Sequence, residues 1–219
     1  MIAVQRFANG IRTRRLKERQ HISQVSHRLI LLAEKLLFRP SIRLREQAEM
    51  LGDYVRQGES VLDVGCGAGY LSKYLEEMYA VKPTGLDVTD FRAIPISFRS
   101  FDGTSIPFPE RTFDHVVLSF VLHHSHDPMT LIQECHRVAR RNIIIFEDLP
   151  DRLFGRIRLF LHVSICALFY SFRPARNADY RFALVWLNDK AVDVVRIAMP
   201  PERLTLYPRF LLVYAFSDD

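Results

Sequence analysis

The segment 61–71 limits what this chain can fold into more than any other part of its sequence. It reads VLDVGCGAGYL, an apolar run that leads into three glycines at every second position. Glycine allows positive φ and lets a ligand lie against bare backbone, and one tight turn would need only one of them. We therefore expect a strand, a ligand-binding loop and a helix, with the loop at the carboxyl end of the first parallel strand, where open α/β sheets bind ligands.

The rest of the sequence after residue 59 fits such a sheet. Short β-branched runs alternate with helical stretches, which is typical of parallel βαβ units. The expected strands are 60–64, 81–87, 97–101, 113–120 and 142–146, and the expected helices between them are 70–79, 90–94 and 128–139. Two final strands, 191–197 and 209–216, are joined by a loop too short for a parallel crossover, so we expect an antiparallel pair. The predicted fold class is α/β with a Rossmann-like sheet.

The N-terminal part has a different character. Apolar spacings of three and four predict an amphipathic helix over residues 13–38, and a second helix follows it. Residues 1–45 hold 11 Lys and Arg against two Glu, a net charge of +9, so the formal net charge of +5 leaves −4 for the remainder. We divide the chain into a basic helical arm or lid, 1–57, and a ligand-binding domain, 58–219.

Composition excludes several classes of protein. At 48% hydrophobic and 25% charged residues, the chain is long enough to bury a core and is expected to be globular. Its three cysteines make neither a disulfide framework nor a zinc pattern, so we predict no metal and a reducing compartment. We see no secretory leader and no apolar run of about 18 residues, and expect a cytoplasmic protein.

Two carboxylates indicate the ligand. Asp63 precedes the loop, and the glycine spacing is G-x-G-x-G, whereas the dinucleotide fingerprint is G-x-G-x-x-G. A carboxylate here would repel pyrophosphate and attract an amine. Asp87 ends the second strand, where a carboxylate can accept from both ribose hydroxyls. Ribose, an amino acid and a positive centre together describe S-adenosylmethionine (SAM).

The chain resembles the class I SAM-dependent methyltransferases that act on small molecules, in particular those of ubiquinone and menaquinone biosynthesis. The resemblance covers about residues 58–148 and rests on motifs in the family's order: VLDVGCGAG at 61–69, GLDV at 85–88, DGTSIPF at 102–108 with FD at 113–114, VLHH at 121–124 and ECHRV at 134–138. It implies the sheet order 3-2-1-4-5-7-6 with strand 7 antiparallel. The family's Pro-Gly-Gly turn before strand five is absent, because residues 139–142 read ARRN.

The resemblance also implies which residues bind the cofactor. Asp63 and the backbone of the loop would bind the methionine end, and Asp87 the ribose. Val88 would pack on adenine, Asp102 would accept from the adenine amino group, and the segment at the end of strand four would lie near the sulfonium. The full predicted set is Asp63, Gly65, Cys66, Gly67, Gly69, Asp87, Val88, Asp102, Gly103, Ser119 and Phe120. Asp102 as a turn cap and Phe120 as ordinary core are alternatives.

Methyl transfer is an in-line displacement on an activated sulfonium, so the protein mainly aligns the acceptor and excludes water. A base is needed only if the nucleophile carries a proton, and His124, followed by His123, is the candidate. These histidines could instead orient the loop or cap the helix at Asp127-Pro128. Glu147 and Asp148, after strand five, could bind a cationic acceptor or act as a base.

The acceptor is predicted to be a small apolar or aromatic metabolite, methylated at O or C. Residues 119–122 read SFVL and lack the Asn/Asp-Pro-Pro-aromatic motif of nucleic-acid and protein N-methyltransferases. An apolar insertion over 151–180 is expected to cover the substrate. The alternatives are a silent scaffold that keeps the SAM fold and an RNA methyltransferase that uses the basic arm. Peripheral membrane contact through the arm is a further hypothesis, nucleic acid is disfavoured, and the oligomeric state is open.

Overall fold

The computed structural model describes residues 40–148, 180–199 and 209–217. The helix expected over 13–38 and almost all of the insertion predicted at 151–180 lie outside these residues. The described part contains the glycine loop and every residue predicted to bind the cofactor.

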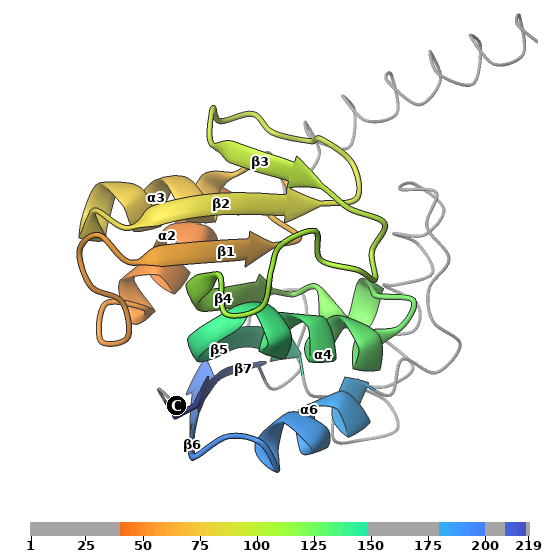
Figure 1. Ribbon diagram of the computed structural model, residues 1–219. Helices are drawn as coiled ribbons and strands as arrows, with labels where there is room; N and C mark the ends of the chain where they lie inside the picture. The colour runs from red at the N-terminus through yellow and green to blue at the C-terminus, as the bar shows by residue number, and fades with distance from the viewer. Residues whose placement is uncertain (1–39, 149–179, 200–208, 218–219) are drawn as a thin grey trace, which may run out of the picture.

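A seven-stranded sheet forms the centre of the fold (Figure 1). Its order is β3-β2-β1-β4-β5-β7-β6, in which β7 runs antiparallel to both β5 and β6, so the expected topology is confirmed. The strands are β1 (Ser60–Val64), β2 (Lys82–Asp87), β3 (Ser97–Ser100), β4 (Phe113–Ser119), β5 (Ala139–Asp148), β6 (Asp193–Met199) and β7 (Arg209–Ala215).

Helices cover both faces of the sheet, because alternate residues of its central strands point to opposite faces. Val61 and Val117 pack on the side of α2 (Pro40–Met50) and α3 (Tyr70–Tyr79). Leu62 and Val116 pack on the other side, against α4 (Pro128–Val138) and α6 (Tyr180–Asn188). The two pairs of helices can be followed on either side of the sheet in Figure 1.

Helix α2, which we assigned to the basic arm, is anchored in this core. Ala48 and Leu51 are fully buried and belong to the apolar cluster between α3 and the sheet. Residues 40–57 therefore pack as part of the described fold, and the lid function of the arm stays a prediction. Among the described residues, no helix has both the length and the apolar character needed to cross a bilayer.

Some predicted boundaries were wrong. Residues 90–94 form no helix, because Arg92 instead holds Asp90 through a bidentate pair (2.7 and 2.8 Å) and donates to the carbonyl of Ile96 (2.7 Å). Helix α6 was not predicted, although its buried Ala183 and Leu187 follow a helical period. The residues directly before α6 belong to the insertion predicted at 151–180.

The start of β5 also differs from the prediction. The strand begins at Ala139, directly after α4, and not at residue 142, so the three residues read as a turn are part of the strand. Arg140 donates to the carbonyl of Arg111 and lies 3.6 Å from a carboxylate oxygen of Asp114. Arg141 donates to Glu59 Oε1 (2.6 Å). These contacts replace the family's Pro-Gly-Gly turn.

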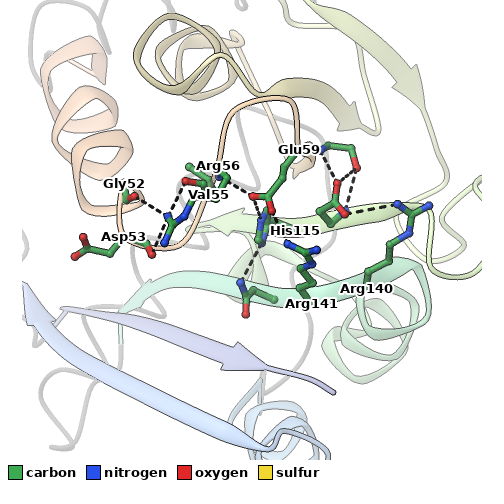
Figure 2. A network of polar contacts seen from close by, with 11 residues as sticks. Gly52, Asp53, Val55, Arg56, Glu59, His115, Arg140 and Arg141 are labelled. Carbon is green, nitrogen blue, oxygen red and sulfur yellow. Dashed lines mark hydrogen bonds and ion pairs between the residues drawn. The ribbon is translucent and has the colours of Figure 1, made fainter. Parts of the chain in front are cut away.

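His115 is the centre of this polar network (Figure 2). It is 1% exposed on β4, with Nε2 2.8 Å from Glu59 Oε2 and Nδ1 3.1 Å from Asn142 Nδ2. Because the amide nitrogen of Asn142 can only donate, Nδ1 of His115 accepts, and Nε2–H of His115 donates to Glu59. Glu59 also accepts from the backbone N–H of Arg56 (2.6 Å). The network joins the amino ends of β1, β4 and β5.

We predict that Glu59→Gln lowers the free energy of unfolding by ~1–3 kcal/mol, because a carboxylate that serves His115, Arg141 and a backbone N–H becomes a neutral amide. Urea denaturation followed by circular dichroism measures this value. Glu76→Gln, an exposed carboxylate on α3, is the matched control and should change it by less than ~0.5 kcal/mol. Equal effects of the two substitutions would show that the network does not stabilise the fold.

Candidate cofactor site

The glycine loop between β1 and α3 is fixed by its own backbone. Gly65, Gly67 and Gly69 have φ of 70°, 51° and 85°, values that L side chains rarely adopt. The N–H groups of Gly65 and Cys66 both donate to the carbonyl of Leu86, at 2.7 and 3.2 Å, which holds the loop against the end of β2. The predicted strand, loop and helix are therefore confirmed.

Two of these glycines have opposite surroundings. A Cβ on Gly65 would lie 2.4 Å from Cγ2 of Val121, so close packing by the segment after β4 excludes any side chain. A Cβ on Gly67 would have no described atom within 4 Å. The described residues therefore leave space next to Gly67, where a ligand can approach the backbone.

Asp63, the last polar residue of β1, is buried beside this loop. It is 1% exposed, and its Oδ2 accepts from the Ser72 hydroxyl of α3 at 2.7 Å. Burial, with a smaller contribution from the negative charge of Asp87, raises the pKa of Asp63 to about 7. The cost of ionising this carboxylate falls when a cation binds next to it.

Asp87 connects the end of β2 to the loop. Its Oδ2 accepts from the N–H of Gly67 (3.0 Å) and its Oδ1 from the N–H of Val88 (2.7 Å). Burial raises the pKa of Asp87, and these backbone donors act in the opposite direction. Each carboxylate oxygen keeps a lone pair, so Asp87 can accept from hydroxyls while it holds the loop.

The residues predicted to contact adenine lie together. Val88 is 52% exposed, unusual for valine, and a Cβ on Gly103 would lie 3.4 Å from its Cγ1. Asp102 caps the turn that follows: its Oδ1 accepts from the N–H and hydroxyl of Thr104 and from the N–H of Ser105, at 2.8–2.9 Å. These donors lower the pKa of Asp102. Asp102 thus has the turn-capping role left open above, and its contact with adenine stays a prediction.

The end of β4 meets helix α2. The hydroxyl of Ser119 donates to Gln47 Oε1 (2.8 Å), and the next residue, Phe120, has a φ of 58°. A bulky residue in this region is strained and occurs mostly at functional sites. Its N–H donates to the carbonyl of Phe146 (2.8 Å), and its ring packs on the α2/α3 side of the sheet. Phe120 therefore also contributes to the core, as the alternative reading allowed.

The two candidate histidines have different surroundings in η1 (Leu122–His124). His123 is 2% exposed, and its Nδ1 lies 2.5 Å from Oε1 of Glu147, itself fully buried. Glu147 Oε2 accepts from the N–H of Leu122 (3.1 Å). The ring of His124 is half-buried, with its centroid 4.1 Å from that of His123. Of the two, His124 is the better placed to reach a substrate.

Three further residues of the sequence analysis are Asp127, Cys66 and Asp148. Asp127 caps α4 itself, since its carboxylate accepts from the N–H and hydroxyl of Thr130 (3.0 and 2.6 Å), so the histidines are not needed as caps. Burial raises the pKa of the Cys66 thiol, which stays protonated near neutral pH and lines the loop as an apolar group. The side chain of Asp148 lies outside the described set.

Gln47 contacts the predicted site residue Ser119 and was not singled out by the sequence analysis. It is fully buried on α2 and reaches Ser119, 72 residues further along the chain. The available signal was its position, since Gln47 lies between Leu44 and Leu51 on the apolar face of the helix. A polar residue there needs a partner, but the pattern does not name one.

Comparisons with known proteins indicate which proteins this chain resembles. Residues 62–146 match the family model described as a methyltransferase domain. A demethylmenaquinone methyltransferase from Geobacillus sp. is 28% identical over 176 residues, which are 71% of this chain and 72% of that protein. A mitochondrial arginine-hydroxylase, NDUFAF5 from Rattus norvegicus, is 31% identical over 100 residues, 42% of this chain and 29% of that protein, so the chain spans under a third of this relative.

Solved structures show the same fold. A SAM-dependent methyltransferase from Archaeoglobus fulgidus superposes with a TM-score of 0.60 at 17% identity, over 85% of this chain and 99% of that one. The paired carboxylates and the room above Gly67 fit SAM, which is the cofactor of this fold. The chain thus has the fold of the SAM-dependent methyltransferases, and its residues 62–146 match the methyltransferase domain.

Proposed function

We propose that this protein transfers a methyl group from SAM to an oxygen or carbon atom of a small, apolar or aromatic metabolite. The observation that carries the proposal is the buried carboxylate of Asp63, whose raised pKa of about 7 makes it a site for a cation beside a loop with room for a ligand. The ammonium group of an amino acid would pair with this carboxylate.

Each part of the cofactor has a matching group in this proposal. Asp63 binds the ammonium, and Asp87 accepts from the ribose hydroxyls while it holds the N–H of Gly67. The exposed side chain of Val88 packs on adenine. Bound SAM supplies an activated methyl group on a sulfonium, so the chain's own task is to orient the acceptor and exclude water.

A proton has to leave an acceptor hydroxyl, and we assign this task to His124. Imidazole titrates near neutral pH, and the ring of His124 is the accessible member of the pair. His123 and Glu147, both buried, hold the segment and set the position of its neighbour. An acceptor that is already ionised would need no such base.

The class of acceptor rests on the sequence of the segment after β4 and on similarity. One relative is named a demethylmenaquinone methyltransferase, which supports the proposed class, and another is named an arginine-hydroxylase, so the relatives carry more than one named activity. Transfer of a labelled methyl group from SAM to a panel of quinol precursors, phenols and terpenoids tests the class. SAM binding without transfer to any acceptor, RNA included, would favour the scaffold alternative.

We predict that Asp87→Ala weakens binding of S-adenosylhomocysteine (SAH) by ~1–3 kcal/mol, because it removes the ribose acceptor and the partner of the Gly67 N–H. Titration calorimetry measures the change. Asp90→Ala, an exposed carboxylate three residues later that pairs with Arg92, is the control and should leave the affinity within twofold. Unchanged SAH affinity in Asp87→Ala would contradict the ribose assignment.

We predict that SAH affinity rises about tenfold between pH 6 and pH 8. Free Asp63 has a pKa of about 7, and the bound ammonium favours its ionised form, so at lower pH binding must first remove a proton. Calorimetry across this range measures the slope. Asp63→Asn should bind SAH more weakly at pH 8 and lose the slope; a slope that persists in Asp63→Asn belongs to another group.

We predict that His124→Gln lowers kcat about 100-fold for a hydroxyl acceptor found in the panel, with SAH affinity unchanged. The measurement is initial rate of labelled methyl transfer. His126→Gln, an exposed histidine of the same segment, is the matched control and should keep the rate. Equal rates in the two variants would remove His124 from the mechanism and leave proximity as the source of catalysis.

A further inference from the structure

Gln47 has an amide donor that the described protein leaves unused. The residue is 0% exposed, its Oε1 accepts from Ser119, and its Nε2 has no hydrogen-bond partner among the residues that the structure describes. Buried polar atoms are almost always paired, and an unpaired donor costs free energy. An orphan donor next to a ligand site indicates that the ligand supplies the acceptor.

The register of the sheet fixes where this donor lies. Val64 of β1 pairs with Leu118 of β4, so the residues that follow them, Gly65 and Ser119, are neighbours at the carboxyl ends of the two strands. Ser119 holds the Gln47 amide at this point. The free donor is therefore beside the first glycine of the loop.

Arg43 lies one helical turn before Gln47 on the same face of α2. Its guanidinium carbon is 5.2 Å from the ring centroid of Phe120, the residue that follows Ser119. Helix α2 thus brings a positive charge and an amide donor to one place, while Asp63 offers a negative charge to the loop from β1. An amino acid zwitterion matches this distribution of charge, with its ammonium toward Asp63 and its carboxylate toward α2.

We propose that Gln47 Nε2 donates to the carboxylate of the methionine end of SAM, with Arg43 supplying the opposite charge. Helix α2, outside the residues 62–146 matched by the family model, is then part of the cofactor site. The inference rests on the proposed function in one respect, that SAM is the ligand. The competing occupant is a polar atom of the methyl acceptor.

The test compares two ligands by calorimetry on the full chain. SAH has the carboxylate, and its decarboxylated analogue S-adenosyl-3-thiopropylamine keeps the amine and the nucleoside but lacks it. The variants are Gln47→Met, which removes the donor at similar length, and Arg43→Met. Arg45→Met is the matched control, because Arg45 lies on the same helix, is exposed and pairs with Glu49.

We expect Gln47→Met and Arg43→Met each to weaken SAH binding at least tenfold, as for loss of a hydrogen bond to a charged group, and to change analogue binding less than twofold. Arg45→Met should leave both affinities unchanged. Wild-type protein should bind SAH at least tenfold more tightly than the analogue.

Equal losses for the two ligands would overturn the proposal, because they would mean that Gln47 only holds Ser119 in place. Unchanged SAH affinity in both variants, or equal wild-type affinity for SAH and the analogue, would overturn it as well. If Gln47→Met loses its cooperative thermal unfolding, Arg43→Met alone decides. Wild-type protein that binds neither ligand would instead refute the proposed function.

Discussion

The carboxylate of Asp63 lies in the apolar interior between β1 and α3, where it accepts a hydrogen bond from the Ser72 hydroxyl. Taking a carboxylate out of water is costly unless a cation or several donors compensate, and burial therefore raises the pKa of Asp63 to about 7. The negative charge of Asp87 adds to this cost. A cation beside Asp63 would offset this cost, which is why we propose that the ammonium of the cofactor binds there.

The surroundings of Asp63 follow from where the strands end. Parallel strands direct their carboxyl ends to one edge of the sheet, so the loop after β1, the carboxylate after β2 and the segment after β4 meet there. The N–H of Gly67 donates to Asp87, and the N–H of Gly65 to Leu86, which makes the loop a rigid surface before any ligand binds. Preorganisation of this kind reduces the free energy lost on binding.

The amino ends of the strands are stabilised by a separate set of contacts. The amino ends of β1, β4 and β5 are joined by Glu59, the buried His115 and Asn142 (Figure 2). This network lies at the opposite ends of the strands from the glycine loop. Substitutions there can change folding without touching the ligand. This separation explains how the chain can lack the usual turn before β5 and still present the loop correctly, since Arg140 and Arg141 tie the start of the strand to its neighbours.

Local patterns in the sequence were sufficient to locate the strands, the glycine loop and the two carboxylates that flank it. Each of these features is specified by residues that are next to one another in the chain. The short loop before β7 was sufficient for its antiparallel direction, and motif resemblance for the order of the strands. The helix predicted at 90–94 is absent because five residues are too few to form a stable helix, and Arg92 pairs with Asp90 there instead.

Tertiary structure alone decided the contacts between distant residues. Gln47 and Ser119 are 72 residues apart, and Glu59 and His115 are 56 apart, so no periodicity relates them. A polar residue on an apolar helix face shows that a partner must exist, because burial without one is costly. Only the packing of α2 against the sheet shows that this partner is Ser119 at the end of β4, which uses the Gln47 Oε1 and leaves Nε2 without a partner among the described residues.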